Sequence, residues 1–145
     1  MQSILDFCEN STPTQYSSHE VLIEEGKQSG FLYVLLEGEV DIVKGDIVIN
    51  TVSDPGAIFG EMSVLLDLPH MASVKTVVPS KFYKFTSEDS FFNSDDISWQ
   101  LATVLAKRLN NITNYLVELK KRSAESEEQL GMVCEVLEKY IYQNK

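Results

Sequence analysis

The chain has 145 residues, of which 43% are hydrophobic, and a formal net charge of −10 with 12 basic residues. This length predicts one domain with its own core, and the acidic balance argues against a nucleic-acid-binding surface, which needs clustered Lys and Arg. No apolar run approaches the roughly 20 residues of a membrane helix, and the N-terminus does not resemble a signal peptide. Cys8 and Cys134 lack metal-binding spacing. We therefore expect a cytoplasmic protein without a metal site or a membrane contact.

Residues 1–13 are expected to form a helical turn or irregular segment that ends at Pro13. From Thr14 onward, short apolar runs alternate with turns that contain Gly or Pro. These runs predict strands over residues 21–23, 31–36, 40–43, 47–49, 73–78 and 82–85, with a hairpin turn at Lys44–Asp46. Closely spaced short strands are typical of an antiparallel barrel or jelly-roll, so residues 14–86 predict a β-roll.

Residues 87–145 are expected to be helical. Thr86–Asp89 has the hydroxyl and acidic residues of a helix start, with Phe91 and Phe92 packing that short helix on the barrel, and Asn93–Asp96 is a second start. No proline follows Ile97. The helix is either continuous or broken within the polar run at residues 120–129.

A heptad pattern along this helix predicts a homodimer through a C-terminal coiled coil. The alternative is that residues 101–119 pack on their own barrel. One seam line consists of Leu105, Ile112, Leu119, Ser126, Val133 and Tyr140, and the other of Leu109, Leu116, Ser123, Leu130, Leu137 and Asn144. The seam is weak at Ser123 and Ser126.

The stretch Phe59–Val74, FGEMSVLLDLPHMASV, follows an Asp-Pro-Gly turn. It resembles the phosphate-binding cassette of the cyclic nucleotide-binding domain family, found in catabolite activators, cyclic-AMP-dependent kinase regulatory subunits and cyclic-nucleotide-gated channels. That cassette reads roughly F-G-E, a short apolar helix, then P-R-small-A-[ST]-V. The resemblance extends from about Tyr16 to Leu119. It implies a mainly β fold with α: an antiparallel β-roll (jelly-roll) with flanking helices and a long C-terminal helix.

The resemblance further implies that the pocket takes cyclic AMP or cyclic GMP as its ligand and needs no other cofactor. The ligand-binding residues implied are Phe59, Gly60, Glu61, Met62, Ser63, His70, Met71, Ala72 and Ser73. Glu61 would accept a hydrogen bond from the ribose 2′-hydroxyl, while the backbone near Met62 and Met71 would donate to the phosphate. If the pocket is empty, Glu61 could instead cap Ser63 or pair with a lysine.

His70 departs from the family pattern, which has a phosphate-binding arginine at this position. An unperturbed imidazole is only about a quarter cationic at pH 7, although a bound phosphate would raise that fraction. Losing a charged hydrogen bond costs about 1.5–3 kcal/mol, equivalent to a roughly ten- to hundredfold loss of affinity. Two interpretations stay open: His70 faces the phosphate, or it is a surface turn residue after Pro69.

Two functions follow from these observations. The chain is a stand-alone cyclic nucleotide sensor that signals through its C-terminal helices, or a ligand-free dimeric scaffold of the same fold. We do not expect an enzyme, because G-x-S-x-G, H-E-x-x-H and GK[ST] motifs are absent and His19 and His70 are the only histidines. We also do not expect a helix-turn-helix, because the residues after Arg122 are acidic and continue the heptad pattern.

Overall fold

The computed structural model describes residues 3–89, 95–122, 135–136 and 138–139. The chain divides into two compact units, residues 1–98 and 99–145. The first unit contains a short 3-10 helix, the strands and one short helix. These are η1 (Asp6–Cys8), β1 (Thr14–Tyr16), β2 (Val21–Ile23), β3 (Phe31–Glu37), β4 (Val40–Lys44), β5 (Ile47–Val52), β6 (Ile58–Phe59), α1 (Glu61–Leu66), β7 (Ser73–Thr76) and β8 (Ser80–Thr86).

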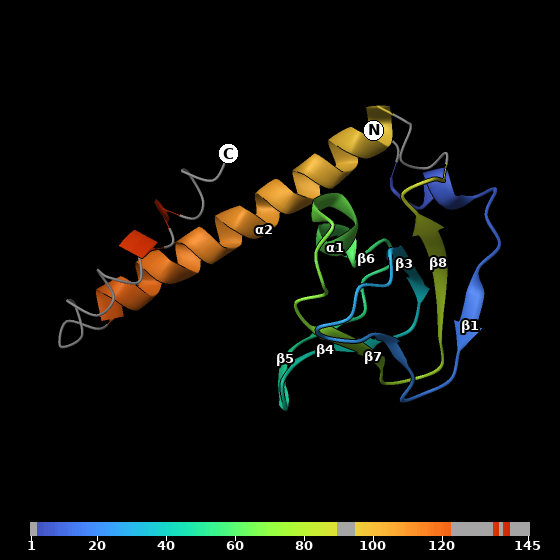
Figure 1. The fold of residues 1–145 in the computed structure, drawn as a ribbon, viewed down its shortest axis with the longest axis horizontal. Coiled ribbons are helices and arrows are strands. Elements are labelled where there is room, and N and C mark those ends of the chain that lie inside the picture. Colours follow the sequence, from blue (N-terminus) through green and yellow to red (C-terminus); the bar gives the residue numbers. More distant parts are fainter. Residues whose placement is uncertain (1–2, 90–94, 123–134, 137, 140–145) are drawn as a thin grey trace. The chain divides into compact units, whose positions relative to one another are not determined.

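The strands form two antiparallel sheets of four strands each (Figure 1). One sheet has the order β1-β8-β3-β6 and the other β2-β7-β4-β5. Consecutive strands often lie in different sheets, as β2 and β3 do, so the chain winds between the layers as expected of a β-roll. The predicted fold class, a mainly β roll followed by a long helix, is confirmed.

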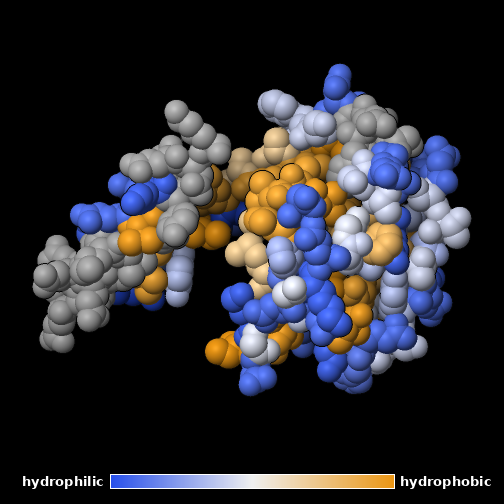
Figure 2. Space-filling view, in the orientation of Figure 1, coloured by the Kyte–Doolittle hydropathy of each residue, from blue (hydrophilic) through white to orange (hydrophobic). Residues whose placement is uncertain are grey.

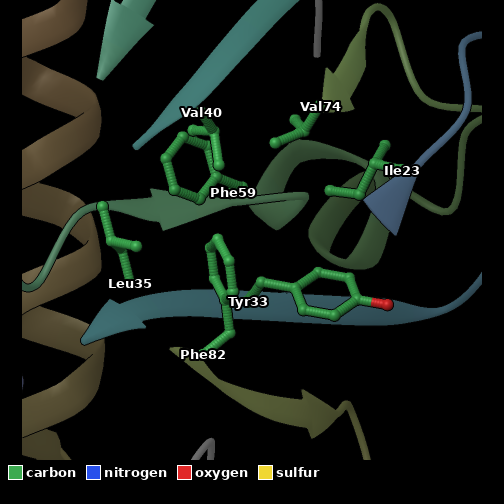
Figure 3. Packing of buried hydrophobic residues seen from close by; sticks show 7 residues of the cluster. All are labelled: Ile23, Tyr33, Leu35, Val40, Phe59, Val74 and Phe82. Carbon is green, nitrogen blue, oxygen red and sulfur yellow. The ribbon is translucent and has the colours of Figure 1, made fainter. Parts of the chain in front are cut away.

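The main core lies between the two sheets and receives side chains from both (Figure 3). One sheet contributes Tyr33, Leu35, Phe59 and Phe82, and the other contributes Ile23, Val40 and Val74. Phe82 is fully buried and makes edge-to-face ring contacts with Tyr16, Tyr33 and Phe59 at centroid distances of 5.8, 6.2 and 6.3 Å. These contacts hold β8, β1, β3 and β6 together, because edge-to-face packing adds to the hydrophobic gain of burial.

Strand boundaries differ from the sequence prediction in several places: β5 extends to Val52, β8 begins two residues early at Ser80, and β1 and β6 had no predicted range. Residues 73–78 were expected to be one strand, but β7 ends at Thr76 and β8 already begins at Ser80. The backbone N–H of Val77 donates to the carbonyl of Glu39 instead of continuing a ladder. Ser80 pairs with Tyr16 and is 1% exposed, so residues 77–79 connect the two strands and the connection lies earlier in the chain than predicted.

The helix α2 (Asp95–Arg122) begins within the predicted start signal at residues 93–96. Acidic residues occupy its first turn and basic residues its last, which suits the helix dipole. Thr86–Asp89 forms a turn in which the Asp89 carboxylate accepts from the Thr86 N–H at 2.6 Å. The predicted packing of Phe91 and Phe92 and every heptad position from Ser123 onward lie outside the described residues, as does the choice between a continuous helix and a break after Arg122.

Apolar side chains reach the surface in two places on the first unit (Figure 2). One lies over α1 and the loop after it, and the other at the β4–β5 hairpin. The exposed apolar residues there are Met62, Leu65, Leu66, Leu68 and Met71 at the first place, and Ile47, Val48 and Ile49 at the second. No helix among the described residues has both the length and the apolar character required to cross a membrane.

Candidate functional site

The cassette begins where β6 leaves the core and the chain turns at Gly60. This residue has φ +84°, a left-handed conformation that glycine adopts without steric cost. A Cβ atom on Gly60 would lie 2.6 Å from the carbonyl oxygen of Phe31 and 3.1 Å from Cδ1 of Ile23. Glycine is therefore required at this position for two reasons: its backbone angle is left-handed, and β3 approaches too closely for a Cβ atom.

The helix α1 places two polar residues on its buried side. Glu61 is 3% exposed and Ser63 is 4% exposed. The Ser63 hydroxyl donates to the carbonyl of Leu68, and the N–H groups of Asp67 and Leu68 bond to the Ser63 carbonyl. Asp67 ends the helix in the left-handed region, with φ +55°. Ser63 thus closes the loop that returns the chain toward His70.

His70 is buried, at 5% exposure, and is held by its backbone as well as its ring. Its N–H donates to the carbonyl of Lys27 and its carbonyl accepts from the N–H of Gly26, both at 2.9 Å. Nε2 of the imidazole lies 2.7 Å from Oγ of Ser29. Burial lowers the pKa of His70, because desolvation disfavours the imidazolium. The interpretation of His70 as an exposed turn residue is therefore wrong.

Glu61, Gly60 and His70 lie in one neighbourhood. A Cβ atom on Gly60 would lie 3.5 Å from Cε1 of His70, so the imidazole packs beside the glycine that precedes α1. Glu61 follows that glycine directly and is equally buried. The sequence-predicted residues from the two ends of the cassette are thus brought together by the α1 turn.

The other predicted site residues have different surroundings. Phe59 points into the core, and Met62 and Met71 are largely exposed, at 43% and 59%. Ala72 and Ser73 are partly buried, and Oγ of Ser73 accepts a hydrogen bond from the N–H of Glu25 at 2.9 Å.

Residues outside the cassette also contact it, and sequence reasoning missed Ser29, Lys44 and Glu25 among them. Ser29 bonds to the His70 ring, as described above. Nζ of Lys44 donates to the Met71 carbonyl at 2.7 Å and pairs with Glu25 at 3.1 Å. The Glu25 carboxylate also accepts from the N–H of Gly45 at 2.8 Å, and these two contacts lower its pKa. Lys44 therefore brings a cation to the cassette, but nothing in the local sequence shows that the hairpin turn folds back to it.

Within the described part of the chain, no three His, Cys, Asp or Glu side chains form a group that could hold a metal ion. The chemistry that the neighbourhood offers is hydrogen bonding: a buried carboxylate, a buried imidazole paired with a hydroxyl, and the backbone of a glycine turn.

Comparison with known proteins agrees with this geometry. The model of the family described as "Cyclic nucleotide-binding domain" matches residues 13–92. The chain is 36% identical over 77 residues to an uncharacterised ABC transporter ATP-binding protein of Mycobacterium tuberculosis, covering 48% of this chain and 23% of that protein. It is 26% identical over 114 residues to the CRP-like cAMP-activated global transcriptional regulator of the same species, covering 74% of this chain and 51% of the regulator. The chain thus spans about half or less of either relative.

Among solved structures, the Thermus thermophilus catabolite activator protein superposes with a TM-score of 0.67 at 23% identity, covering 80% of this chain and 56% of that chain. At this level of identity the likeness concerns the fold. The family model, in contrast, matches more than half of the chain and includes all of the cassette. The chain therefore belongs to the cyclic nucleotide-binding domain family.

Proposed function

We propose that this chain is a regulatory module that binds a cyclic nucleotide, cyclic AMP or cyclic GMP, in its β-roll. The observation that carries the proposal is that two buried polar residues, Glu61 and His70, adjoin Gly60 at the start of α1. Both side chains are at least 95% buried, and a buried polar residue needs a structural or binding reason to be there. In this role Glu61 accepts a hydrogen bond from the ribose 2′-hydroxyl, and His70 faces the phosphate.

In this proposal, ligand binding is signalled by the C-terminal helices, which also form a homodimer. Support comes from α2, where two consecutive apolar seam positions, Leu109 and Ile112, are 43% and 54% exposed in the single chain. Fully burying an exposed Leu or Ile side chain is worth about 1.5–3 kcal/mol, so covering these half-exposed side chains with a second copy would contribute roughly half of that each. Ligand binding would then shift the helices after Thr86 and alter the dimer.

The same exposed seam favours a second candidate, the ligand-free dimeric scaffold. Both candidates have the same fold and the same helix, and they differ only in whether the cassette is occupied. The scaffold predicts an α2-dependent dimer that is unchanged by nucleotide. The sensor predicts a dimer whose stability depends on nucleotide.

Thermal unfolding with and without millimolar cyclic AMP and cyclic GMP tests the proposal. Ligand at a hundredfold above its dissociation constant adds about 2.7 kcal/mol, which corresponds to roughly 10 °C for a chain of this size. We expect this shift from one nucleotide, and we expect Glu61→Gln to remove most of it, because the amide keeps the shape of the side chain but loses its charge.

Glu88→Gln is the matched control, because Glu88 is exposed in the turn after β8. It makes the same change in net charge and should keep the full shift. If neither nucleotide shifts the midpoint of the unchanged protein, the sensor proposal fails and the scaffold stands. If nucleotide raises the unfolding midpoint equally in the Glu61 and Glu88 variants, Glu61 does not contribute to nucleotide binding.

A further inference from the structure

The contact between Ser29 and His70 joins the β2–β3 loop to the cassette. Nε2 of His70 and Oγ of Ser29 lie 2.7 Å apart, a short and well-formed hydrogen-bond distance. Ser29 is exposed, whereas His70 is 5% exposed. The hydroxyl therefore lies between a buried ring and solvent.

The loop between β2 and β3 fixes this pair. It holds the His70 backbone through the Lys27 carbonyl and the Gly26 N–H, two hydrogen bonds of 2.9 Å on either side of the same residue. Cε1 of the ring, the carbon bonded to Nε2, lies beside Gly60. The same part of the imidazole thus contacts Ser29 and borders the glycine turn that begins the cassette.

The direction of the Ser29–His70 hydrogen bond depends on the protonation state of the ring. A neutral imidazole has one N–H and one acceptor nitrogen, so Nε2 can accept from the Ser29 hydroxyl. In an imidazolium both nitrogens are donors, so Nε2–H must donate to Oγ. The Ser29 hydroxyl hydrogen is then released to donate to another acceptor.

An anion beside this pair favours the second arrangement. A nearby negative charge stabilises the imidazolium and raises the pKa of the ring, whereas burial in the free protein lowers it. The two effects have opposite directions, so an anion beside the ring favours the imidazolium that burial disfavours. The cyclic phosphodiester stays a monoanion at neutral pH and supplies that charge.

We infer that Ser29 and His70 form one proton-coupled recognition unit for the phosphate of the ligand. Binding adds a proton to His70 and reverses the Ser29 hydrogen bond, so that the ring supplies the positive charge and Ser29 supplies a hydroxyl donor. This inference rests on the proposed function, and it deepens that function by making nucleotide affinity depend on pH near neutrality.

Other ionisable groups surround the pair and must be distinguished from it. The β2–β3 loop carries Glu24, Glu25 and Lys27, the cassette carries Glu61 and Asp67, and β4 brings Lys44 to the Met71 carbonyl. The ionisable group of each of these residues is an amine or a carboxylate, and none of them is an imidazole. A change at His70 alone therefore has to abolish the pH dependence if the imidazole is its origin.

Isothermal titration of cyclic AMP and of cyclic GMP into the full chain measures this coupling directly. Titrations near neutral pH in two buffers of different ionisation enthalpy give the number of protons taken up. We expect between about half and one proton per nucleotide, and a dissociation constant that rises by up to about tenfold per pH unit between the pKa values of the free and bound ring.

Three variants complete the test. His70→Arg carries a permanent charge, so its affinity should not change with pH and its proton uptake should be near zero. Ser29→Ala should keep the proton uptake but bind several-fold more weakly, because the hydroxyl donor is lost. His19→Asn is the control for the other histidine: His19 is exposed with φ +62°, which Asn tolerates, and the pH dependence should stay.

Each outcome decides the question. A pH-dependent affinity that His70→Arg abolishes and His19→Asn keeps supports the inference. Nucleotide binding by the unchanged chain with a flat pH profile overturns the inference and leaves the proposed function intact. No binding by the unchanged chain at any pH near neutrality overturns both, and circular dichroism at each pH establishes that the chain is folded in these measurements.

Discussion

Gly60→Ala tests the reason for the cassette's first turn. The substitution places an L side chain at φ +84°, which costs about 1–2 kcal/mol. The added Cβ would also lie 2.6 Å from the Phe31 carbonyl oxygen, a backbone atom that can move only if β3 moves. Relieving such overpacking costs about 1–3 kcal/mol more. We therefore expect a total loss of about 2–5 kcal/mol in the free energy of unfolding, measured by urea denaturation followed by circular dichroism.

Gly26→Ala is the matched control for this experiment. Gly26 has nearly the same backbone angle, φ +83°, but a Cβ there would have no atom within 4 Å. It should lose only the conformational part, about 1–2 kcal/mol. The reasoning is refuted if the two variants lose equal stability, because the close approach of β3 would then have no energetic consequence.

Three further predictions concern the buried polar residues Ser63, Thr76 and His70. Ser63→Ala should lower the free energy of unfolding by about 1–3 kcal/mol in urea denaturation, because the Leu68 carbonyl loses its donor. Thr76→Val should lose a similar amount, because the buried Oγ1 accepts from the Glu20 N–H at 2.9 Å and donates to the Ser17 carbonyl at 2.6 Å. Unchanged midpoints would show that water replaces these contacts. The third prediction concerns pH: burial lowers the pKa of His70, so near pH 6 the unfolded chain binds more protons than the folded one. Stability of the ligand-free protein should therefore fall as pH drops from about 7.5 to about 5.5, and His70→Gln should reduce that fall, whereas an equal fall in both proteins would assign it to other groups.

The fold was largely predictable from the sequence because most of its strands can be recognised from their local hydrophobic pattern and the turns that bound them. Phe31–Leu36 is a short apolar run and Val40–Val43 alternates apolar and polar residues; both are bounded by turns, and they form β3 and β4. The error at β7 and β8 has a tertiary cause. Val77 and Val78 have strand propensity, but the strand partner of Val77 is replaced by a single bond to Glu39, while Ser80 finds a ladder partner in Tyr16.

The candidate site was predictable only along the cassette itself. The resemblance identified Gly60, Glu61 and His70, which are close in sequence and linked by one short helix. Ser29 and Lys44 reach the cassette from the β2–β3 loop and the β4–β5 hairpin, so their roles depend on how the two sheets pack. A serine in a polar loop and a lysine at a hairpin turn carry no local signal of that packing.

The central claim is that the cassette of this chain binds a cyclic nucleotide, and equilibrium dialysis against labelled cyclic AMP and cyclic GMP tests it most directly. The account predicts saturable binding of one nucleotide per chain, competed by the same unlabelled nucleotide and lost in Glu61→Gln but not in Glu88→Gln. No saturable binding of either nucleotide at millimolar concentration, by protein shown to be folded, would contradict it.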